Sequence, residues 1–292
     1  MQNRMANQIG PQEVTLVLGG TGKIGHRVAE RLSDRGICTR AAARTADPAF
    51  DWNDRRGWSA VLDGVAVVFI SYAPDLAIPG ATDTVRAFVE QAVGQGVKRL
   101  VLLSGRGEDE ARRCERIVQS AGVDWTVVRA SWFNQNFSEG AFLDMIRNGN
   151  VALPAGTVAE PFVDADDIAD VAVAALAEDG HHGKVYEITG PRCLTFAEAV
   201  EAIATAEGRE IQYVRIPGEA FRAGVAESGA PDDVAWLLDY LFSTVLDGRN
   251  AQTGDGVQRA LGREPKDFSE YARQSAASGV WKVPPWRNMA VA

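Results

Sequence analysis

Residues 14–25 read VTLVLGGTGKIG and constrain the fold more than any other stretch of this chain. The segment Val14–Leu18 is apolar or β-branched and predicts a short buried strand. Glycines follow at positions 19, 20, 22 and 25, and Ile24, Val28 and Leu32 then recur at helical spacing. A strand, a glycine turn and an amphipathic helix form the setting in which a G-x-x-G-x-x-G run binds a dinucleotide.

The glycine positions fit two registers, one that starts at Gly19 and one that starts at Gly20. The chain must turn tightly here, its backbone must approach a pyrophosphate, and the helix N-terminus must offer N–H groups to the anion. We therefore expect a dinucleotide to contact Gly19, Gly20, Thr21, Gly22, Lys23 and Ile24. The alternative is a degenerate turn of the same shape that no longer binds a cofactor.

The second predicted strand, near residues 37–43, indicates which dinucleotide is bound. A site that prefers NAD usually has an acid at the end of this strand, where it accepts the ribose 2′-hydroxyl. This chain has Arg40 and Arg44 there instead, in the sequence ICTRAAART. Because a guanidinium matches phosphate oxygens, we expect NADP rather than NAD, with Arg44 as the better candidate and Arg40 as the second. The alternative is that both are solvated surface arginines.

Strand-like and helix-like runs alternate over the first 130 residues, which predicts βαβ units and a parallel sheet. The fold class is therefore α/β: a Rossmann-like, doubly wound parallel sheet with a smaller, mostly helical C-terminal substrate lobe. Strands are expected near residues 14–18, 37–43, 65–70, 99–104 and 124–129, with a short one near 49–51. Helices are expected near 23–35, 81–95 and 108–121.

The regular alternation of strand-like and helix-like runs ends after residue 130. We expect helices at 167–179 and 195–208, the latter opened by a Thr195–Glu198 capping box, and strands at 185–190 and 211–216. Residues 217–278 read mostly as helices. We place a dinucleotide-binding domain at 13–155, with later segments returning to its sheet, and the substrate lobe at 156–280. The apolar run at 281–286, WKVPPW, packs either on this lobe or on another subunit.

Composition excludes several classes of protein. A net charge of −9 without a basic stripe argues against nucleic-acid binding. No apolar run is long enough to span a membrane, and the polar start lacks a signal-peptide core. Three scattered cysteines, Cys38, Cys114 and Cys193, favour a reducing, cytoplasmic location. His181 and His182 fit a solvated turn better than a metal site, so we expect no metal.

The remaining candidate residues follow the later strands, because ligands of open α/β sheets sit outside the carboxyl ends of the strands. Ser71, Tyr72, Ala73 and Pro74 follow the third expected strand, and Ser104 follows the fourth. All five are candidate cofactor contacts. Tyr72 and Ser104 are also the candidate proton donors or oxyanion partners.

The segment RASWFNQNF, residues 129–137, is rich in aromatic side chains interleaved with asparagines. Aromatic rings offer a flat wall to a nicotinamide or a planar substrate, and amides can orient it. We expect substrate contacts from Trp132, Phe133, Asn136 and Phe137. The alternative is that some of these rings pack inside the lobe.

Taken in order, VLGGTGKIG, RAAAR, LLSG, DWTVVRASWFNQNF, PFVDADDIADVAVAAL and VYEITGPRCLTFAEAVEAIA resemble the NmrA-like family. These are atypical short-chain dehydrogenases/reductases that bind NAD(P), and the resemblance runs from about residue 13 to residue 277. FDW at 50–52 and WFNQNF at 132–137 resemble the branch of the ergot-alkaloid reductases. The resemblance implies an extended Rossmann core, and a role as either a reductase or a dinucleotide-binding regulator.

One difference between this chain and ordinary members of the wider class limits the reactions that we expect it to catalyse. Ordinary members of the wider class use a Tyr-x-x-x-Lys pair, and this chain contains no Y-x-x-x-K sequence. In many relatives a lysine stands four residues before the glutamate that corresponds to Glu115, and here that position is Ala111. We therefore expect an NADPH-dependent reductase of a planar small molecule, such as an imine or iminium, a quinone or an activated enone. The main alternative is a non-catalytic redox sensor; an isomerase or dehydratase fits less well, and a homo-oligomer stays open.

Overall fold

The computed structural model describes residues 13–140 and 142–282, and these divide into two compact units. Within the described residues, unit 1 comprises 13–130, 165–188 and 254–264. Unit 2 comprises 131–164, 189–253 and 265–282. The polar start of the sequence, residues 1–12, lies outside the described residues.

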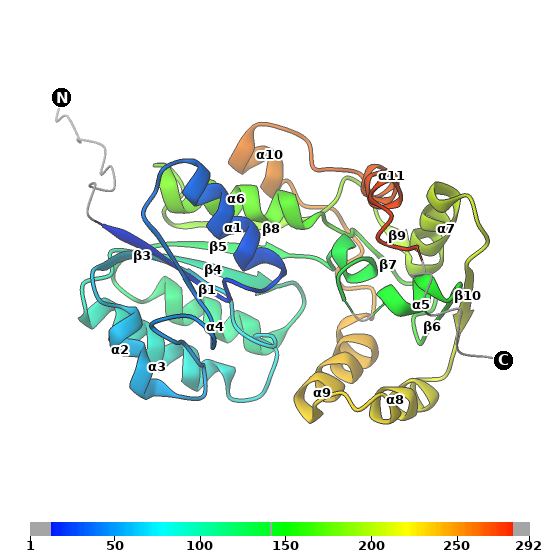
Figure 1. Ribbon diagram of the computed structural model, residues 1–292, viewed down its shortest axis with the longest axis horizontal. Helices are drawn as coiled ribbons and strands as arrows, with labels where there is room; N and C mark the ends of the chain where they lie inside the picture. Colours follow the sequence, from blue (N-terminus) through cyan, green and yellow to red (C-terminus); the bar gives the residue numbers. More distant parts are fainter. Residues whose placement is uncertain (1–12, 141, 283–292) are drawn as a thin grey trace. The chain divides into compact units, whose positions relative to one another are not determined.

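Unit 1 is built on one parallel sheet of six strands (Figure 1). Its order is β2 (Thr39–Ala42), β1 (Val14–Leu18), β3 (Val65–Ile70), β4 (Arg99–Gly105), β5 (Asp124–Ala130) and β8 (Lys184–Ile188). The inner strands β1 and β3 are almost continuously apolar and buried, because helices cover both faces. The expected α/β, doubly wound Rossmann-like fold is confirmed.

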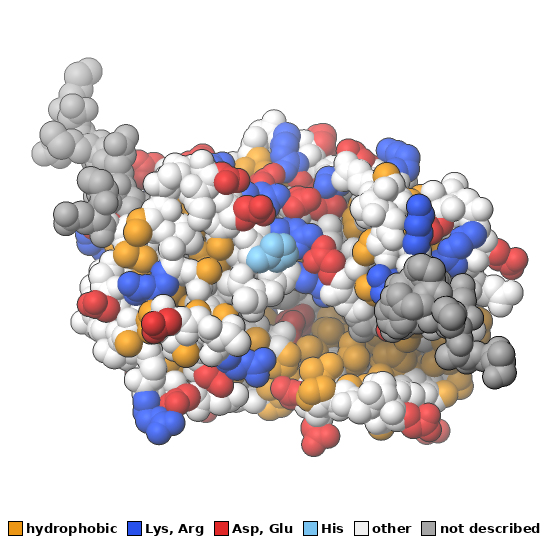
Figure 2. Space-filling view, viewed as in Figure 1, with side chains coloured by type: hydrophobic (Ala, Val, Ile, Leu, Met, Phe, Trp, Pro, Cys, Tyr) orange, Lys and Arg blue, Asp and Glu red, His pale blue; other side chains and the backbone are white. Residues whose placement is uncertain are grey.

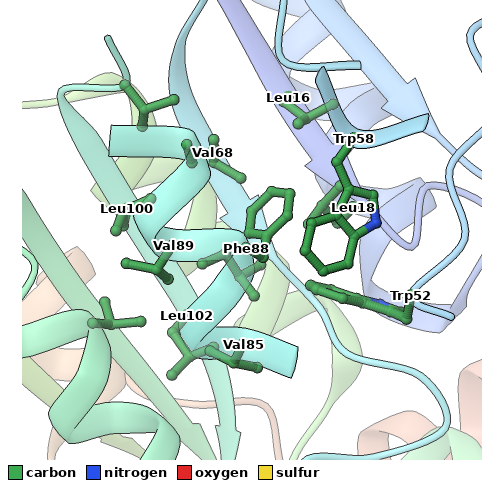
Figure 3. Close-up of a cluster of buried hydrophobic side chains, with 14 of the residues drawn as sticks. Leu16, Leu18, Trp52, Trp58, Val68, Val85, Phe88, Val89, Leu100 and Leu102 are labelled. Carbon is green, nitrogen blue, oxygen red and sulfur yellow. The ribbon is translucent and has the colours of Figure 1, made fainter. Parts of the chain in front are cut away.

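Two layers of helices enclose this sheet. One face carries α1 (Lys23–Asp34), α6 (Ala165–Ala177) and α10 (Gly256–Leu261), and the other carries α2 (Trp58–Val61), α3 (Ala81–Gly94) and α4 (Asp109–Gln119) (Figure 1). A short 3-10 turn, η1 (Arg55–Gly57), precedes α2. Between the sheet and the second layer, Leu16, Leu18, Trp58, Phe88 and Leu102 are fully buried (Figure 3).

Unit 2 combines two small sheets with several helices. β6 (Asn150–Leu153) pairs in parallel with β10 (Gln212–Arg215), and β7 (Ala159–Glu160) pairs antiparallel with β9 (Leu194–Thr195). Its helical segments are η2 (Asn134–Phe137), α5 (Leu143–Arg147), α7 (Phe196–Glu207), α8 (Gly218–Glu227), α9 (Asp232–Tyr240), η3 (Leu241–Val245) and α11 (Phe268–Ser278). The predicted capping box at Thr195 and Glu198 is present at the start of α7.

Most predicted elements are present within one or two residues of their expected ends. The strand predicted near 49–51 is wrong, because this segment is a loop whose Phe50 and Trp52 side chains pack in the core of unit 1. The structure also changes unit at Ala130/Ser131, earlier than residue 155, because β6 pairs with β10 and so joins the second unit. β8, which comes later in the sequence, is the last strand of the main sheet.

The start of the apolar C-terminal run packs on unit 2 of the same chain. Trp281 is 0% exposed, and its indole Nε1 donates a 2.7 Å hydrogen bond to the carbonyl oxygen of Phe137. Arg147 donates two hydrogen bonds to the carbonyl of Val280, at 3.1 and 2.9 Å. Of the two locations that the sequence left open, the lobe of the same chain is therefore the one seen for Trp281.

We predict that Trp281→Ala lowers the free energy of unfolding by about 3–5 kcal/mol, because it leaves a large cavity in unit 2. Trp281→Phe keeps most of the packing but leaves the Phe137 carbonyl without its donor, so we expect a loss of about 1–3 kcal/mol. The measurement is urea unfolding followed by circular dichroism. Trp236→Ala, at a tryptophan that is 40% exposed, is the matched control and should cost about 1 kcal/mol or less. Equal losses for Trp281→Ala and Trp236→Ala would contradict this account.

Candidate functional site

The turn between β1 and α1 requires glycine at three positions, because of a positive φ at one of them and close contacts at the other two. Gly19 has a φ of +68°, which favours glycine. A Cβ on Gly25 would lie 2.0 Å from the carbonyl oxygen of Gly19. A Cβ on Gly20 would lie 2.8 Å from the Cβ of Ala41 on β2. The turn is therefore fixed against both its own helix and the neighbouring strand.

The N-terminus of α1 is built to receive an anion. Its N-cap residue is Gly22, no side chain caps the helix, and its first turn contains no acidic residue. The N–H groups at the start of a helix and the helix dipole together attract negative charge. Thr21 and Gly22 are exposed at this turn, whereas the Ile24 side chain is 3% exposed. Ile24 therefore offers its backbone rather than its side chain.

The strand order places this turn at a topological switch point. From β1 the chain moves outward to β2 and then returns to β3 on the other side of β1. Ligands of open α/β sheets bind in the crevice where the strand order reverses. Ser71, directly after β3, lies beside the turn, since a Cβ on Gly19 would be 3.3 Å from its Cβ and Oγ atoms. Ala73 and Pro74 follow it and are exposed.

The two arginines of the second strand have different surroundings. Arg44 is exposed and follows the carboxyl end of β2. Arg40 is half-buried, and its Nη1 donates to the carbonyl oxygens of Val61 at 2.6 Å and Asp63 at 2.8 Å. Arg40 therefore fastens β2 to the end of α2, whereas Arg44 is accessible to a ligand at the edge of the sheet.

Ser104 belongs to a buried ionic network. Its hydroxyl donates a 2.7 Å hydrogen bond to Oε1 of Glu115, which also accepts from Nε of Arg129 at 2.8 Å. Glu187 on β8 accepts from both Arg129 and Arg106. Burial opposes ionisation of Glu115, but the hydrogen bonds from Arg129 and Ser104 outweigh it and lower the pKa of this carboxyl. The hydroxyl of Ser104 would have to leave Glu115 before it could serve a substrate.

Tyr72 is half-buried, and its ring lies 4.8 Å from that of Trp52 between centroids. Burial raises the pKa of its phenol, and a hydrogen bond with Thr84 opposes this shift. The phenol therefore stays protonated at neutral pH and cannot act as a base. Ala111, at the position of the family's lysine, is 0% exposed and packs in the core of unit 1.

The aromatic segment after β5 belongs to unit 2, and its members are buried to different degrees. Trp132 is partly buried against Phe196, and Phe133 is half-buried beside Val163. Asn136 is also half-buried. Phe137 is 0% exposed and packs against other phenylalanine rings in the core of unit 2, so it offers no surface to a ligand. Figure 2 shows hydrophobic side chains gathered on one face of unit 2, over α8 and α9.

Sequence reasoning missed one pair of acidic side chains at this edge of unit 1. Asp75 follows Ser71–Pro74, and Glu108 is the last residue of the segment after β4; burial and the Asp75 carboxyl group both raise the pKa of Glu108. A glycine-rich turn at 105–108 was visible in the sequence, but nothing in the pattern paired its glutamate with an aspartate more than 30 residues earlier.

The turn that holds the histidine pair is exposed, as expected, except at His181. His181 is buried, and its Nδ1 lies 2.9 Å from the hydroxyl of Tyr186. His182 is exposed, and its Nδ1 accepts from the backbone N–H of Trp125. Among the described residues, no group of three or more His, Cys, Asp or Glu side chains is arranged to hold a metal. No helix within 13–140 or 142–282 has the length and hydropathy to cross a bilayer.

A cavity of about 660 Å³ lies at the opposite edge of the sheet of unit 1. It is lined by the first residues of β3, β4 and β5, including Ala66, Arg99 and Asp124. Arg99 donates to the carbonyl oxygens of Leu176 and Glu178. Since ligands of such sheets bind at the carboxyl ends, this cavity is not the dinucleotide site.

We predict that Gly25→Ala destabilises the protein by about 1–3 kcal/mol, because the new methyl group meets the Gly19 carbonyl and forces α1 away from the turn. Gly94→Ala is the matched control, since a Cβ there meets nothing within 4 Å. In a helix this control should be neutral or stabilise by up to about 1 kcal/mol. Thermal unfolding of both variants tests the prediction; equal melting temperatures would show that the close approach is not required.

Relatives of this chain extend over nearly its whole length. An NAD(P)H azoreductase of Xenophilus azovorans is 32% identical, with 90% of this chain and 98% of the azoreductase covered. An uncharacterized oxidoreductase of Bacillus subtilis is also 32% identical, with 91% of this chain and 96% of the oxidoreductase covered. Agroclavine dehydrogenase of Claviceps fusiformis is 31% identical, covering 91% and 98%. The expected similarity to ergot-alkaloid reductases is therefore confirmed.

Solved structures share the fold at lower identity. An NADPH-dependent quinone oxidoreductase of Escherichia coli, complexed with NADPH, superposes with a TM-score of 0.72 at 21% identity, covering 89% of this chain and 99% of that one. Triphenylmethane reductase of Citrobacter, complexed with NADP(H), superposes with a TM-score of 0.71 at 18% identity, covering 90% of this chain and 99% of the reductase. The negative transcriptional regulator NmrA, in complex with NADP, superposes with a TM-score of 0.69 at 15% identity, covering 94% of this chain and 99% of the regulator.

The family model described as the NmrA-like family matches residues 11–272, which is most of the sequence. This match includes the glycine turn, the arginines after the second strand and the aromatic segment after β5. The chain belongs to the NmrA-like family.

Proposed function

We propose that this chain is an NADPH-dependent oxidoreductase that reduces a planar small-molecule acceptor: an imine or iminium, a quinone or an activated enone. The observation that carries the proposal is the N-terminus of α1. No side chain caps this helix, and its first turn contains no acidic residue. The close contact between Gly19 and Gly25 holds it at the switch point of the sheet. The names of an azoreductase, a clavine dehydrogenase, a quinone oxidoreductase and a triphenylmethane reductase among the relatives and fold neighbours support it.

The residues at this edge fit a phosphorylated dinucleotide. The backbone of Gly20, Thr21 and Gly22 and the N–H groups of Lys23 and Ile24 would hold the pyrophosphate. Arg44, exposed at the end of β2, would hold the 2′-phosphate, because its planar fork of donors matches phosphate oxygens. When bound, a reduced nicotinamide supplies a hydride; the chain supplies binding, orientation and exclusion of water.

The proposed acceptor classes follow from the absence of a Tyr-x-x-x-Lys sequence in this chain. Reduction of a ketone leaves a strongly basic alkoxide, which ordinary members of the wider class protonate through a tyrosine and a lysine. An iminium already carries the charge that draws hydride, and a reduced quinone is a weakly basic anion. Positioning of donor and acceptor then supplies most of the rate. We propose Trp132, Phe133 and Asn136 of unit 2 as substrate contacts, and we leave out the buried Phe137.

The first prediction is turnover. We expect oxidation of NADPH, followed by its absorbance, with at least one member of a panel of quinones, cyclic imines and activated enones. Gly22→Asp places a carboxylate at the anion site and should lower turnover at least tenfold, or about 1.4 kcal/mol. Ala60→Asp adds the same charge at an exposed position of α2 and should leave turnover unchanged.

The second prediction concerns cofactor choice. We expect Arg44→Gln to weaken NADPH binding by about 10–100-fold, since hydrogen bonds to charged groups contribute about 1.5–3 kcal/mol. NADH binding should change little, because NADH lacks the 2′-phosphate. Arg40→Gln is the matched control, and its NADPH/NADH ratio should stay near that of the wild type. Titration calorimetry of both cofactors measures these constants, and equal affinities of the wild type for the two would refute the assignment.

A second candidate function is a redox sensor that binds the dinucleotide without turning over a substrate. It is favoured by the missing Tyr-x-x-x-Lys sequence and by the Ser104 hydroxyl, which is bound to Glu115. The fold is shared with a transcriptional regulator that was solved with NADP. A sensor predicts tight NADPH binding, no turnover across the panel, and association with a protein partner that depends on the cofactor.

A further inference from the structure

A small cavity on α3 and α4 is lined by arginine side chains that the proposed function does not use. Its volume is about 240 Å³, and its lining residues are Thr82, Arg86, Arg113, Arg116, Ile117 and Ser120. None of them belongs to the glycine turn or to the segment Ser71–Pro74. The two helices also cover the face of the sheet opposite to α1 (Figure 1). The cavity is therefore separate from the proposed dinucleotide site.

Helical spacing places the polar residues of each helix in one row. Thr82 and Arg86 are four residues apart on α3, and Arg113 and Arg116 are three apart on α4. Ser120, the C-cap of α4, follows four residues later. Side chains three or four positions apart are neighbours on a helix surface. Since both rows line the same cavity, three guanidinium groups from two helices share one small space.

Two of these guanidinium groups have no acidic partner. In the part of the chain that the structure describes, no carboxylate lies within ion-pair distance of Arg86 or Arg116. The third, Arg113, lies 2.7 Å from Oε2 of Glu110, measured from Nη1. Glu110 also accepts hydrogen bonds from the backbone N–H of Thr82 at 3.2 Å and from the Thr82 hydroxyl. Its carboxylate thus serves the start of α3 as well as one arginine.

The cavity carries a positive charge that composition does not explain. Burial opposes ionisation of Glu110, but hydrogen bonds from Thr82 and Arg113 outweigh it and lower the pKa of this carboxyl. Three positive charges and one negative charge then leave two positive charges. Acidic residues outnumber basic ones in this chain, 39 to 30. Like charges at helical spacing destabilise a protein, so this cluster costs stability unless an anion joins it.

We propose that this cavity binds a small dianion, a phosphate group that is either free or part of a small phosphorylated molecule. Guanidinium groups match phosphate oxygens with their planar fork of donors. The hydroxyl groups of Thr82 and Ser120 already donate to Glu110 and to backbone carbonyls, so the arginines are the donors that remain for an anion. The volume is below the ~300 Å³ at which sites for whole drug-sized ligands begin, which excludes a complete dinucleotide.

NMR of the arginine Nε–H groups in nitrogen-15-labelled protein tests the proposal locally. The protein is titrated with inorganic phosphate at constant ionic strength, and Arg→Lys variants assign the signals. The signals of Arg86, Arg113 and Arg116 should shift together and saturate with one Kd. The signal of Arg273, an exposed arginine on α11, is the internal control and should stay in place. Shifts that do not saturate, or that are equal at Arg273, would overturn the proposal.

A parallel titration with methyl phosphate distinguishes the two sources of the phosphate group. An equal or lower Kd for methyl phosphate would identify a phosphorylated molecule as the ligand, because the site then tolerates an ester. A Kd at least tenfold higher than that of inorganic phosphate would identify free phosphate.

Variants test the role of the two unpaired arginines. Arg86→Gln and Arg116→Gln should each raise the Kd for phosphate at least tenfold, because each loses charge-assisted hydrogen bonds to the anion. Arg273→Gln is the matched control and should keep the wild-type Kd. Without phosphate, both cavity variants should melt at or above the wild-type temperature, since repulsion between arginines is relieved. A wild-type Kd in both variants would refute the site.

Saturating NADPH separates this site from the dinucleotide site. The Kd for phosphate at the arginine signals should stay within about threefold of its value without NADPH. Loss of the phosphate shifts on addition of NADPH would assign the anion to the dinucleotide site and overturn the proposal. If NADPH itself does not bind, the proposed function fails, while the arginine signals still decide whether the cavity binds phosphate.

Discussion

The close packing of α1 against the turn that precedes it is the constraint on which the rest of the site depends. The backbone of Gly25 sits where a methyl group would be 2.0 Å from the Gly19 carbonyl, and a methyl group on Gly20 would be 2.8 Å from the Cβ of Ala41 on β2. These contacts fix the direction of α1 and place its N–H groups at the end of β1. They also bring Ser71, after β3, beside the turn. The fold and the anion site therefore require the same glycines, and the loss of one should damage both.

Much of unit 1 could be predicted from the sequence, because its signals are local. Val14–Leu18, the glycines and the helical spacing that follows lie within one short stretch, and each predicts its own conformation. The exposed position of Arg44 also follows from its place just beyond a strand. These features do not depend on which distant segments they meet.

The features that could not be predicted depend on contacts between distant segments. Phe137 looks like a ligand contact in the sequence, but it packs among rings that come from α7, α11 and the loop at Phe162. His181 is buried because β8 brings Tyr186 beside it. The loops that carry Asp75 and Glu108 follow neighbouring strands only because β3 and β4 are adjacent in the sheet. The pattern of hydrophobic and charged residues along the chain does not indicate which distant segments come into contact.

The ionic network around Glu115 engages the hydroxyl of Ser104, one of the two candidate proton donors. Ser104, Arg129 and Arg106 tie β4 and β5 to α4 and, through Glu187, to β8. Removing one partner of a buried ion pair leaves an uncompensated charge, so the loss of Glu115 or Arg129 should destabilise unit 1. The hydroxyl of Ser104 is thus held by Glu115 at the carboxyl edge of the sheet.

The central claim is that the turn after β1 binds a phosphorylated dinucleotide. Phosphorus NMR of NADP⁺ titrated with the protein tests it most directly, because the pyrophosphate and the 2′-phosphate give separate signals. The account predicts that both signals shift or broaden and that the change saturates at one dinucleotide per chain. Signals that stay unchanged in the presence of excess protein would contradict it. A shift of the pyrophosphate alone would keep the turn as the binding site but remove the role of Arg44.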